Sequence, residues 1–486
     1  MKIAFINQPW VETEEKYGVK AGSRWANIRL KNQNLSYYPF PFNMAYTTAL
    51  LRKEGFEAVI KDGIAEEIST DYCINWLKKE NPGVVLVETS TPSIKTDLEF
   101  AQKVKEETGA LIILSGTHAT TMPKEMLIHK QVDFVALGEY EYVILDLMKE
   151  LQKQKPNFAK IKGLCSKSKG KIILNPRREL ITDLDALPFP ERDDLPIYKY
   201  NDPFCKKYPN IPIIASRGCP FKCIYCLEPS VFYGRPLHRA RSPKKIVEEI
   251  ALLVKKYKVK EVYFDDSSLT VNKKYVKDIC YELLRKNVKV NWSCMADARI
   301  DLDTLKLMKR AGCSGLKFGA ETANPEILKT IKKPLNLNII RTFVKNCNKI
   351  GLYTHGTYMF GLPGETRQTI KNTIDFAFSV GSTTSQFAIA TPLPGTEFYS
   401  MAKKNGWLIT DDWSKYEGGS SPVIEYPNLS ARDLQEAIRY AKRRRMVQIL
   451  DNPKVMLQYM IKIYKMNGPV GFVKEMTEKA KFLLKK

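Results

Sequence analysis

The chain has 486 residues, of which 44% are hydrophobic and 27% are charged, and its formal net charge is +24. This length is too great for one ordinary hydrophobic core, so two or three domains are expected, and the composition excludes a disordered protein. The basic charge predicts attraction to polyanions, such as nucleic acid, anionic lipid or a phosphorylated substrate, unless it is only solvated surface.

The sequence shows neither a secretory leader nor a membrane span. Its first residues enter a strand-like pattern without the basic segment and apolar run of a signal peptide. No apolar run approaches the roughly 18 residues of a spanning helix. Ten cysteines, most of them scattered singly, are typical of the cytosol, where clustered cysteines indicate metal binding or catalysis. A cytoplasmic protein is therefore expected.

Residues 1–150 alternate short strand-like and helix-like segments. Strands are predicted at 2–6, 56–60, 84–87, 111–114 and 132–136. This alternation predicts an α/β domain with a parallel, doubly wound, Rossmann-like sheet, whose carboxyl edge binds ligands. The candidate ligand contacts that follow these strands are Asn7, Gln8, Thr89, Ser90, Thr91, Ser115, Gly116, Thr117, His118, Gly138 and Glu139.

A long insertion, residues 10–41, separates the first strand from its helix. Loops of this length are usually functional, and its aromatic, Arg and Pro residues predict a cover over the ligand crevice. Arg24 and Trp25 are candidates for substrate contacts, although a packing role explains them equally well.

A connector at 151–208 contains a predicted hairpin around Gly170 and a proline-rich linker, and a second α/β region follows at 209–404. Its predicted strands are 211–215, 261–264, 289–294, 314–319, 352–359 and 385–390. Six such units predict a partial (β/α)6 barrel. Polar or glycine residues follow the strands, among them Asp265, Asp266, Glu321 and Gly361. Their recurrence at successive strand ends favours ligand contacts over single helix caps.

Three cysteines in one loop, Cys219, Cys223 and Cys226, have the spacing C-x3-C-x2-C directly after the strand at 211–215. This spacing turns three sulfurs toward one centre, which is appropriate for a four-iron cluster held by thiolates. Three ligands leave one iron open to bind another molecule. A zinc site is the alternative, but a structural zinc needs a fourth ligand, for which Cys205 is the candidate.

This loop, with Tyr225 before its last cysteine, resembles the signature of radical S-adenosylmethionine (SAM) enzymes. The run from Gly116 to Pro123 and the Gly138-Glu139 run resemble the cobalamin-binding domain that precedes the cluster loop in many of these enzymes. The resemblance covers residues 1–400. The group includes the anaerobic magnesium-protoporphyrin monomethyl ester cyclase, hopanoid-associated members and the class B methyltransferases.

The resemblance implies three cofactors, namely a [4Fe-4S] cluster, SAM and cobalamin, and a flavodoxin or ferredoxin as reductant. It implies cluster ligation by the three cysteines and cobalamin contacts by the eleven loop residues of the first domain. The SAM contacts that it implies are Tyr225, Asp265, Asp266, Glu321 and Gly361. The D-x-H-x-x-G motif of methionine-synthase-like domains is absent, and His118 is expected to be a hydrogen-bonding loop residue rather than a cobalt ligand.

By this resemblance the function is radical modification of an unactivated carbon, with C-methylation of a bulky, lipid-like substrate favoured over cyclisation or another radical reaction. A tRNA methylthiolase would need three further cluster cysteines in its N-terminal domain, whereas residues 1–163 contain only Cys73. Nucleic acid is therefore not the expected partner. A non-catalytic cofactor-binding protein would not need polar residues at so many strand ends.

The last region, residues 405–486, is basic and is predicted to be helical. Apolar residues at 455–466 lie beside clustered Arg and Lys residues. Two roles remain open for this region. Its helices either cap the open barrel with solvated outer faces, or contact a membrane surface or a lipidic substrate, which would make the protein peripheral at the membrane.

Overall fold

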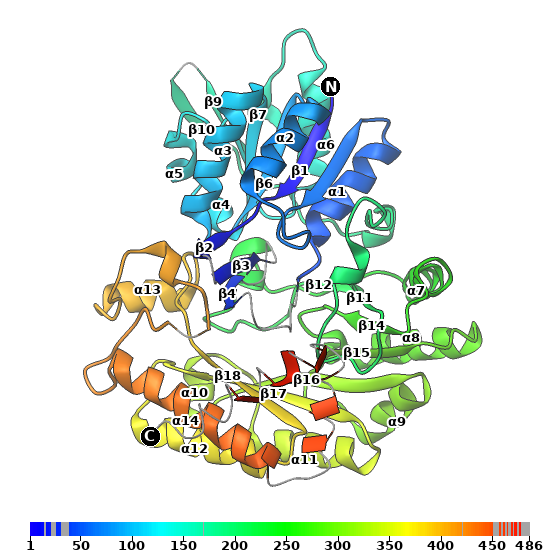
Figure 1. The fold of residues 1–486 in the computed structure, drawn as a ribbon, viewed down its shortest axis with the longest axis vertical. Helices are drawn as coiled ribbons and strands as arrows, with labels where there is room; N and C mark the ends of the chain where they lie inside the picture. The colour runs from blue at the N-terminus through cyan, green and yellow to red at the C-terminus, as the bar shows by residue number, and fades with distance from the viewer. Residues whose placement is uncertain are drawn as a thin grey trace.

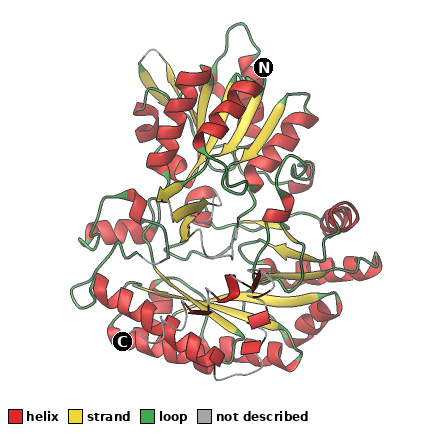
Figure 2. Ribbon diagram, in the orientation of Figure 1, coloured by secondary structure: helices red, strands yellow, loops and turns green. Residues whose placement is uncertain are grey.

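The computed structural model describes residues 1–13, 16–20, 26–30, 38–168, 170–419 and 421–450, and scattered residues between 456 and 477. Two α/β bodies lie one above the other, the N-terminal domain in blue and cyan and the barrel in green to orange (Figure 1). Helices enclose both sheets (Figure 2). The arrangement confirms the predicted fold class.

The N-terminal domain is built on a seven-stranded sheet of order β10-β9-β8-β7-β6-β1-β5. Its parallel strands are β1 (Ile3–Asn7), β5 (Ala58–Asp62), β6 (Val84–Thr89), β7 (Leu111–Gly116) and β8 (Phe134–Ala136). All five were predicted. The predicted hairpin, β9 (Leu164–Ser168) and β10 (Lys171–Leu174), extends this sheet with two antiparallel strands.

Helices cover both faces of this sheet, which explains why β6 is apolar and buried along its whole length. One face packs against α1 (Phe42–Lys53) and α6 (Glu141–Leu151), and the other against α2 (Thr70–Glu80), α3 (Ile94–Thr108) and α5 (Pro123–Ile128). The short helix α4 (Thr117–Thr121) follows β7 directly. The polar loops of the domain therefore gather at its carboxyl edge.

The insertion after β1 forms a three-stranded antiparallel sheet of β2 (Val11–Thr13), β3 (Lys16–Lys20) and β4 (Ala26–Leu30). It lies between the two domains (Figure 1). The substrate candidates Arg24 and Trp25 lie outside the described residues, so their role stays a prediction.

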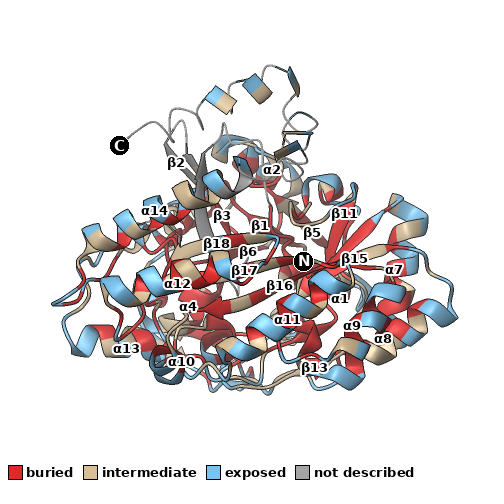
Figure 3. Ribbon diagram, turned by 90° about the horizontal axis from the view of Figure 1, so that it is seen from below, coloured by how far each residue is buried: buried red, intermediate tan, exposed pale blue. Residues whose placement is uncertain are grey.

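The barrel has six parallel strands whose spatial order follows the chain. They are β11 (Asn210–Ile213), β14 (Glu261–Phe264), β15 (Asn291–Met295), β16 (Cys313–Glu321), β17 (Tyr353–Phe360) and β18 (Thr384–Ile389). The helices around it are α7 (Pro243–Tyr257), α8 (Lys273–Arg285), α9 (Leu302–Arg310), α10 (Pro325–Thr330), α11 (Leu337–Lys349), α12 (Arg367–Ser379) and α13 (Glu397–Lys404). Their inner faces are buried and their outer faces exposed (Figure 3).

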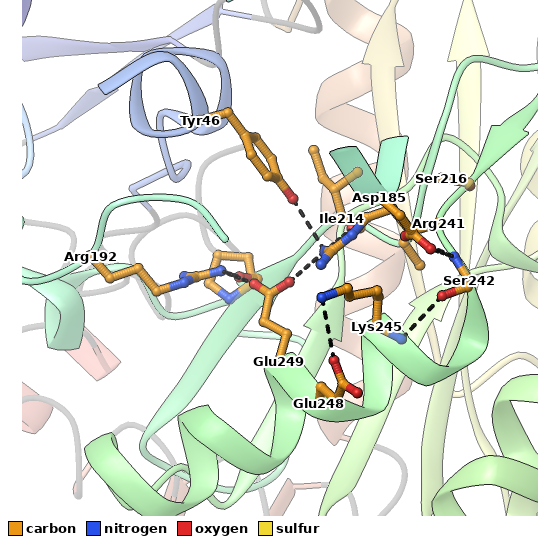
Figure 4. A network of polar contacts seen from close by, with 12 residues as sticks. Tyr46, Asp185, Arg192, Ile214, Ser216, Arg241, Ser242, Lys245, Glu248 and Glu249 are labelled. Carbon is orange, nitrogen blue, oxygen red and sulfur yellow. Dashed lines mark hydrogen bonds and ion pairs between the residues drawn. The ribbon is translucent and has the colours of Figure 1, made fainter. Parts of the chain in front are cut away.

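A buried polar network joins the N-terminal domain, the connector and the barrel (Figure 4). Glu249 on α7 accepts from Arg192 of the connector at 3.0 Å and pairs with Arg241. The Arg241 guanidinium also lies 3.3 Å from the hydroxyl of Tyr46 on α1. Because buried charges are costly unless they are paired, this network favours one relative placement of the three parts.

The C-terminal region is less helical than its composition indicated. Residues 405–419 and 421–430 form a winding segment with one 3-10 turn, η6 (Trp413–Lys415), and helix begins only at α14 (Ala431–Leu450). Glycines and prolines interrupt the earlier part of the segment. α14 packs against β18 and α12, so its described part covers the barrel edge. Within the described residues, no helix has the length and apolar character needed to cross a membrane.

Candidate active site

The cysteine loop is closed at its base by a two-stranded ladder of β12 (Ser216–Arg217) and β13 (Arg239–Ala240). Gly218 adopts φ +83° beside the Leu237 backbone, where a side chain would overlap the carbonyl. The loop then runs through the three cysteines into a π-helical turn, η4 (Glu228–Phe232). The ladder fixes both ends of the loop.

The three thiols lie within one another's electrostatic influence. Cys223 is buried, whereas Cys219 and Cys226 are partly exposed. Burial, the Glu228 carboxylate and the other two thiols raise the pKa of Cys226, and burial raises the pKa of Cys219 to about 11. The thiols are therefore protonated at neutral pH and would release protons on binding metal.

Three cysteines in one loop are the kind of donor set that holds an iron–sulfur cluster. Among the residues that the structure describes, no three Cys, His, Asp or Glu side chains are grouped closely enough to hold one metal ion. Cys205, the candidate fourth zinc ligand, instead lies 3.3 Å from the Ser293 hydroxyl inside the barrel.

An acid–base cluster lies directly behind the cysteines. A β-bulge at the end of β16 places Glu321 at φ +64°, and its carboxylate lies 3.0 Å from Lys333 Nζ. Burial and the Glu321 carboxylate raise the pKa of Tyr225, while Glu321 and the Cys223 thiol raise the pKa of Lys333 despite its burial. Lys333 therefore stays cationic beside the sulfurs, where it can offset the negative charge of a thiolate-bound cluster.

A cavity of about 550 Å³ lies between the two domains. The N-terminal edge contributes Ser90, Thr91, Pro92 and Thr117, and the cysteine loop contributes Cys226, Leu227 and Glu228. The barrel edge and connector contribute Asp202, Pro203, Tyr263, Asp265, Asp266, Ser267, Met295, Lys317, Gln386 and Leu393. Tyr416 and Gly418 of the winding segment complete it. One space is thus shared by the cysteine loop and the first sheet.

The predicted SAM contacts differ in what their side chains do. Asp265 lines the cavity, whereas Asp266 also accepts from the backbone of Ala215 and Ser216 and so secures the strand before the cysteine loop. The Gly361 N–H donates to Glu365 at 2.5 Å. Its carbonyl accepts from Tyr426 at 2.8 Å, so both backbone groups of Gly361 have protein partners. These contact assignments stay predictions.

Of the eleven predicted cobalamin contacts, Ser90, Thr91 and Thr117 line the cavity. Their hydroxyls and small size fit the polar rim of a corrin, and the predicted SAM contacts Asp265 and Asp266 line the same cavity. Gly138 and Glu139 lie instead at the boundary with the cysteine loop, where Glu139 pairs with two arginines.

The remaining predicted cobalamin contacts are internal. The Asn7 amide donates to Asp62 at 3.0 Å, and the Thr89 hydroxyl donates to the Ser115 carbonyl at 2.7 Å. Ser115 and Gly116 are fully buried at the end of β7. These residues hold the loops of the edge to one another.

Gln8 belongs to a buried ion-pair network that the sequence did not indicate. Lys20 of the inserted sheet lies 2.9 Å from the Gln8 side-chain oxygen and 2.8 Å from Asp97 Oδ1. It also donates to the Glu88 carbonyl at 2.7 Å. Both charged side chains are almost wholly inaccessible, so this network fastens the inserted sheet to the N-terminal domain.

His118 lies in the short helix α4 rather than in a loop, and its hydrogen bond goes to a side chain rather than to the backbone, so its assignment as a cobalamin contact stays a prediction. Its Nδ1 lies 3.2 Å from the Thr91 hydroxyl, and its ring lies 5.7 Å from the ring of Trp413. Burial lowers its pKa to about 4, so the imidazole is neutral. It is not among the residues that line the cavity.

Sequence reasoning missed a charged pair within the cavity. Lys317 on β16 lies 2.7 Å from the Asp202 carboxylate and 4.3 Å above the Tyr263 ring. Asp202 belongs to the connector, where no periodic pattern marked it. The alternation of β16 could have indicated Lys317, since Lys is unusual within a barrel strand.

Comparison with known proteins agrees with this geometry. Residues 213–377 match the radical SAM superfamily, and residues 29–148 match the B12 binding domain. An uncharacterized methyltransferase of Pyrococcus horikoshii is 31% identical over 428 residues, which cover 86% of this chain and 89% of the relative. The anaerobic magnesium-protoporphyrin IX monomethyl ester cyclase of Cereibacter sphaeroides is 26% identical over 83% of this chain and 66% of its own length.

The fold resembles that of OxsB, a cobalamin-dependent S-adenosylmethionine radical enzyme solved with aqua-cobalamin and S-adenosylmethionine bound. The TM-score is 0.72 at 14% identity, over 99% of this chain and 70% of that chain. The two domain matches fall on the two sheets that border the cavity. With 31% identity to a relative over most of both chains, they show that the chain belongs to the cobalamin-binding radical SAM enzyme family.

Proposed function

We propose that this enzyme transfers a methyl group to an unactivated carbon of a small molecule held in the interdomain cavity. A single observation carries the proposal: the same cavity of about 550 Å³ is lined by Cys226 and by Ser90, Thr91 and Thr117. When bound, the cluster with SAM supplies a 5′-deoxyadenosyl radical that removes a hydrogen atom, and cobalamin supplies the methyl group. The likeness to an uncharacterized methyltransferase supports this reaction.

The chain's own residues position these groups and exclude water. The three cysteines would hold the cluster, with Lys333 as a neighbouring cation and Glu321 fixed between Lys333 and Tyr225. Burial of the acid–base cluster of Glu321, Lys333 and Tyr225 lowers the local dielectric constant, which strengthens the electrostatic interactions among these side chains.

The cavity supports a substrate with an apolar body and a polar group. Met295, Leu227 and Leu393 supply apolar walls, while Lys317 and Asp202 supply a charged pair. A lipid-like substrate was predicted from sequence. The charged pair favours one that carries a carboxylate, phosphate or amine rather than a pure hydrocarbon.

The test uses anaerobically reconstituted protein with SAM labelled in its methyl group, hydroxocobalamin and a low-potential reductant. A small-molecule extract of cells that lack this protein supplies the substrate, and the expected result is a product that carries the labelled methyl group, together with 5′-deoxyadenosine. Cys223→Ala should lose both the cluster and SAM cleavage. Cleavage retained by that variant would refute the assignment of the loop.

Radical cyclisation without methyl transfer is the second candidate, favoured by the likeness to a cyclase. The same experiment separates the two. Cyclisation forms 5′-deoxyadenosine and a product that contains no labelled methyl group.

Radical SAM enzymes require an electron donor, and we propose an acidic flavodoxin or ferredoxin because of the +24 charge.

Contact with a membrane is a separate proposal. Its support is the exposure of Val447 and Leu450 near the end of the basic helix α14. Co-sedimentation with anionic but not neutral vesicles is the expected result, and no sedimentation with either would contradict it.

A further inference from the structure

The Glu139 carboxylate joins three parts of the molecule. Its Oε1 accepts from Arg217 at 3.0 Å, and its Oε2 accepts from Arg239 at 2.8 Å. The backbone N–H of Ile181 in the connector donates to the same Oε2 at 3.0 Å. The side chain of Glu139 is only 3% exposed, and both of its oxygens have protein donors. It is therefore fully engaged before any cofactor binds.

The two arginines are the residues that close the cysteine loop. Arg217 and Arg239 face each other directly in the β12–β13 ladder, and Cys219 follows Arg217 by two residues. Like charges directly opposite each other destabilise a strand pair, and buried guanidinium groups without a carboxylate are costly. The compensating charges come from the other domain, since Glu141 on α6 also lies 2.7 Å from Arg217.

The same N-terminal loop touches the far side of the cysteine loop as well. Gly138 has φ +61°, and a Cβ atom placed there would lie 2.6 Å from the carbonyl oxygen of Phe232 in η4. A larger residue would force the N-terminal domain away from the turn that follows Cys226. Gly138 and Glu139 thus contact the cysteine loop at its exit and at its base.

We propose that Gly138 and Glu139, with Arg217 and Arg239, form an interdomain clamp that makes a well-held cluster depend on docking of the cobalamin-binding domain. When that domain separates, two opposed arginines lose their carboxylate and the base of the loop opens. If methyl transfer is the reaction, the clamp limits radical formation to the state in which the methyl donor is in place. This last consequence rests on the proposed function, whereas the clamp itself does not.

The first test compares Glu139→Gln with the wild-type holoenzyme after anaerobic reconstitution. The variant keeps the size of the side chain but lacks its charge. We expect bound iron to fall at least twofold and the electron paramagnetic resonance signal of the reduced cluster to change, although Glu139 belongs to the other domain. Wild-type iron content with an unchanged signal would overturn the proposal.

The matched control is Glu179→Gln, because Glu179 also pairs with a basic residue, Lys162, at 2.8 Å but is 76% exposed. It should keep the iron content and spectrum of the wild type. An equal loss in this control would show that any Glu→Gln change is harmful, and would remove the support for a clamp.

A double variant separates the clamp from simple misfolding. Glu139→Gln with Arg239→Gln removes the carboxylate together with one of the two opposed cations, leaving Arg217 to Glu141. We expect the double variant to bind at least twice as much iron as the Glu139→Gln single variant. Iron content equal to or below that of the single variant would contradict the like-charge argument.

Thermal unfolding of the cofactor-free protein tests the clamp independently of the reaction. The wild type should unfold in one thermal transition, whereas Glu139→Gln should unfold in two, since its domains keep the Arg217–Glu141 and Arg241–Tyr46 contacts but lose the carboxylate that pairs with both arginines of the ladder. A single transition in both proteins would contradict the coupling. Failure of the wild type to yield a methylated product would refute the proposed function. It would leave the measurements of bound iron and of thermal unfolding unaffected.

Discussion

The two sheets turn their carboxyl edges toward one cavity, but their polar residues are used differently. In the barrel, the cavity is lined by Asp265 at the end of β14 and by Lys317 and Gln386 within β16 and β18. At the N-terminal edge, Asn7 and Gln8 bond to neighbouring protein groups instead. The N-terminal edge is packed against the inserted sheet and the cysteine loop, so most of its polar groups must be satisfied internally. Position at a strand end therefore predicts the edge on which a residue lies, but not the direction of its side chain.

We call polar residues that bond to other protein groups inward-facing, and those that line the cavity cavity-facing. The comparison predicts that inward-facing residues control the stability of the protein, whereas cavity-facing residues control ligand binding. Lys20→Met provides the largest expected effect, because it leaves the Asp97 carboxylate buried without its cation. The free energy of unfolding should fall by about 3 to 5 kcal/mol, measured from the urea midpoint followed by circular dichroism.

Two controls sharpen this prediction. Lys78→Met removes a pair with Glu107 in which both side chains are about half exposed, and should change stability by less than about 0.5 kcal/mol. Adding Asp97→Asn to Lys20→Met should recover part of the loss. A Lys20→Met protein as stable as the wild type would contradict the prediction that the bonded polar groups of the N-terminal edge control stability.

Glu365 is an inward-facing carboxylate at the barrel edge, where it accepts from the backbone of Gly361 and Leu362. Burial raises its pKa from the usual 4.5 to about 8. Its protonated form is therefore favoured by folding. The stability that this group contributes is fully present below pH 4.5 and is lost as the pH rises through about 8.

Glu365→Gln resembles the protonated form at every pH. It should match the wild type near pH 4.5 and exceed it by about 4 to 5 kcal/mol in free energy of unfolding at pH 8.5. Urea titrations across this pH range measure the difference. An unchanged pH dependence would show that Glu365 is ionised and solvated, contrary to its buried position.

Asp265→Asn gives the smallest expected change and tests a cavity-facing residue. If Asp265 contacts SAM as predicted, loss of one charged hydrogen bond should cost about 1.5 kcal/mol, or roughly a tenfold higher half-saturating SAM concentration, with stability unchanged. The initial rate of 5′-deoxyadenosine formation measures this. The exposed Asp193→Asn is the matched control, since its side chain is 59% accessible. A loss of stability without a change in SAM binding would place Asp265 with the inward-facing group.

Local patterns were sufficient to predict most of the fold and the centre of the site. Apolar runs such as Val84–Val87 marked the strands, and the spacing of Cys219, Cys223 and Cys226 marked the cluster loop. Both signals lie within a few consecutive residues. Asp265 and Thr117 each follow a strand, so their positions at the carboxyl edges of the two sheets could also be predicted.

The remaining features depend on contacts between distant residues. Lys20 meets Asp97 across 77 positions, and Lys317 meets Asp202 across 115. Neither pair can be predicted from a periodic pattern in the sequence. Glu139 belongs to a recognisable motif, but its partners Arg217 and Arg239 lie 78 and 100 positions away in the sequence.

The segment that carries Trp413 and Tyr416 has a consequence for the assembly of the enzyme in the cell. It is synthesised after all six barrel strands, yet Tyr416 and Gly418 supply a wall of the cavity. The cavity wall can therefore be completed only after the barrel strands have been synthesised, and a truncation after α13 would remove the two residues that complete it.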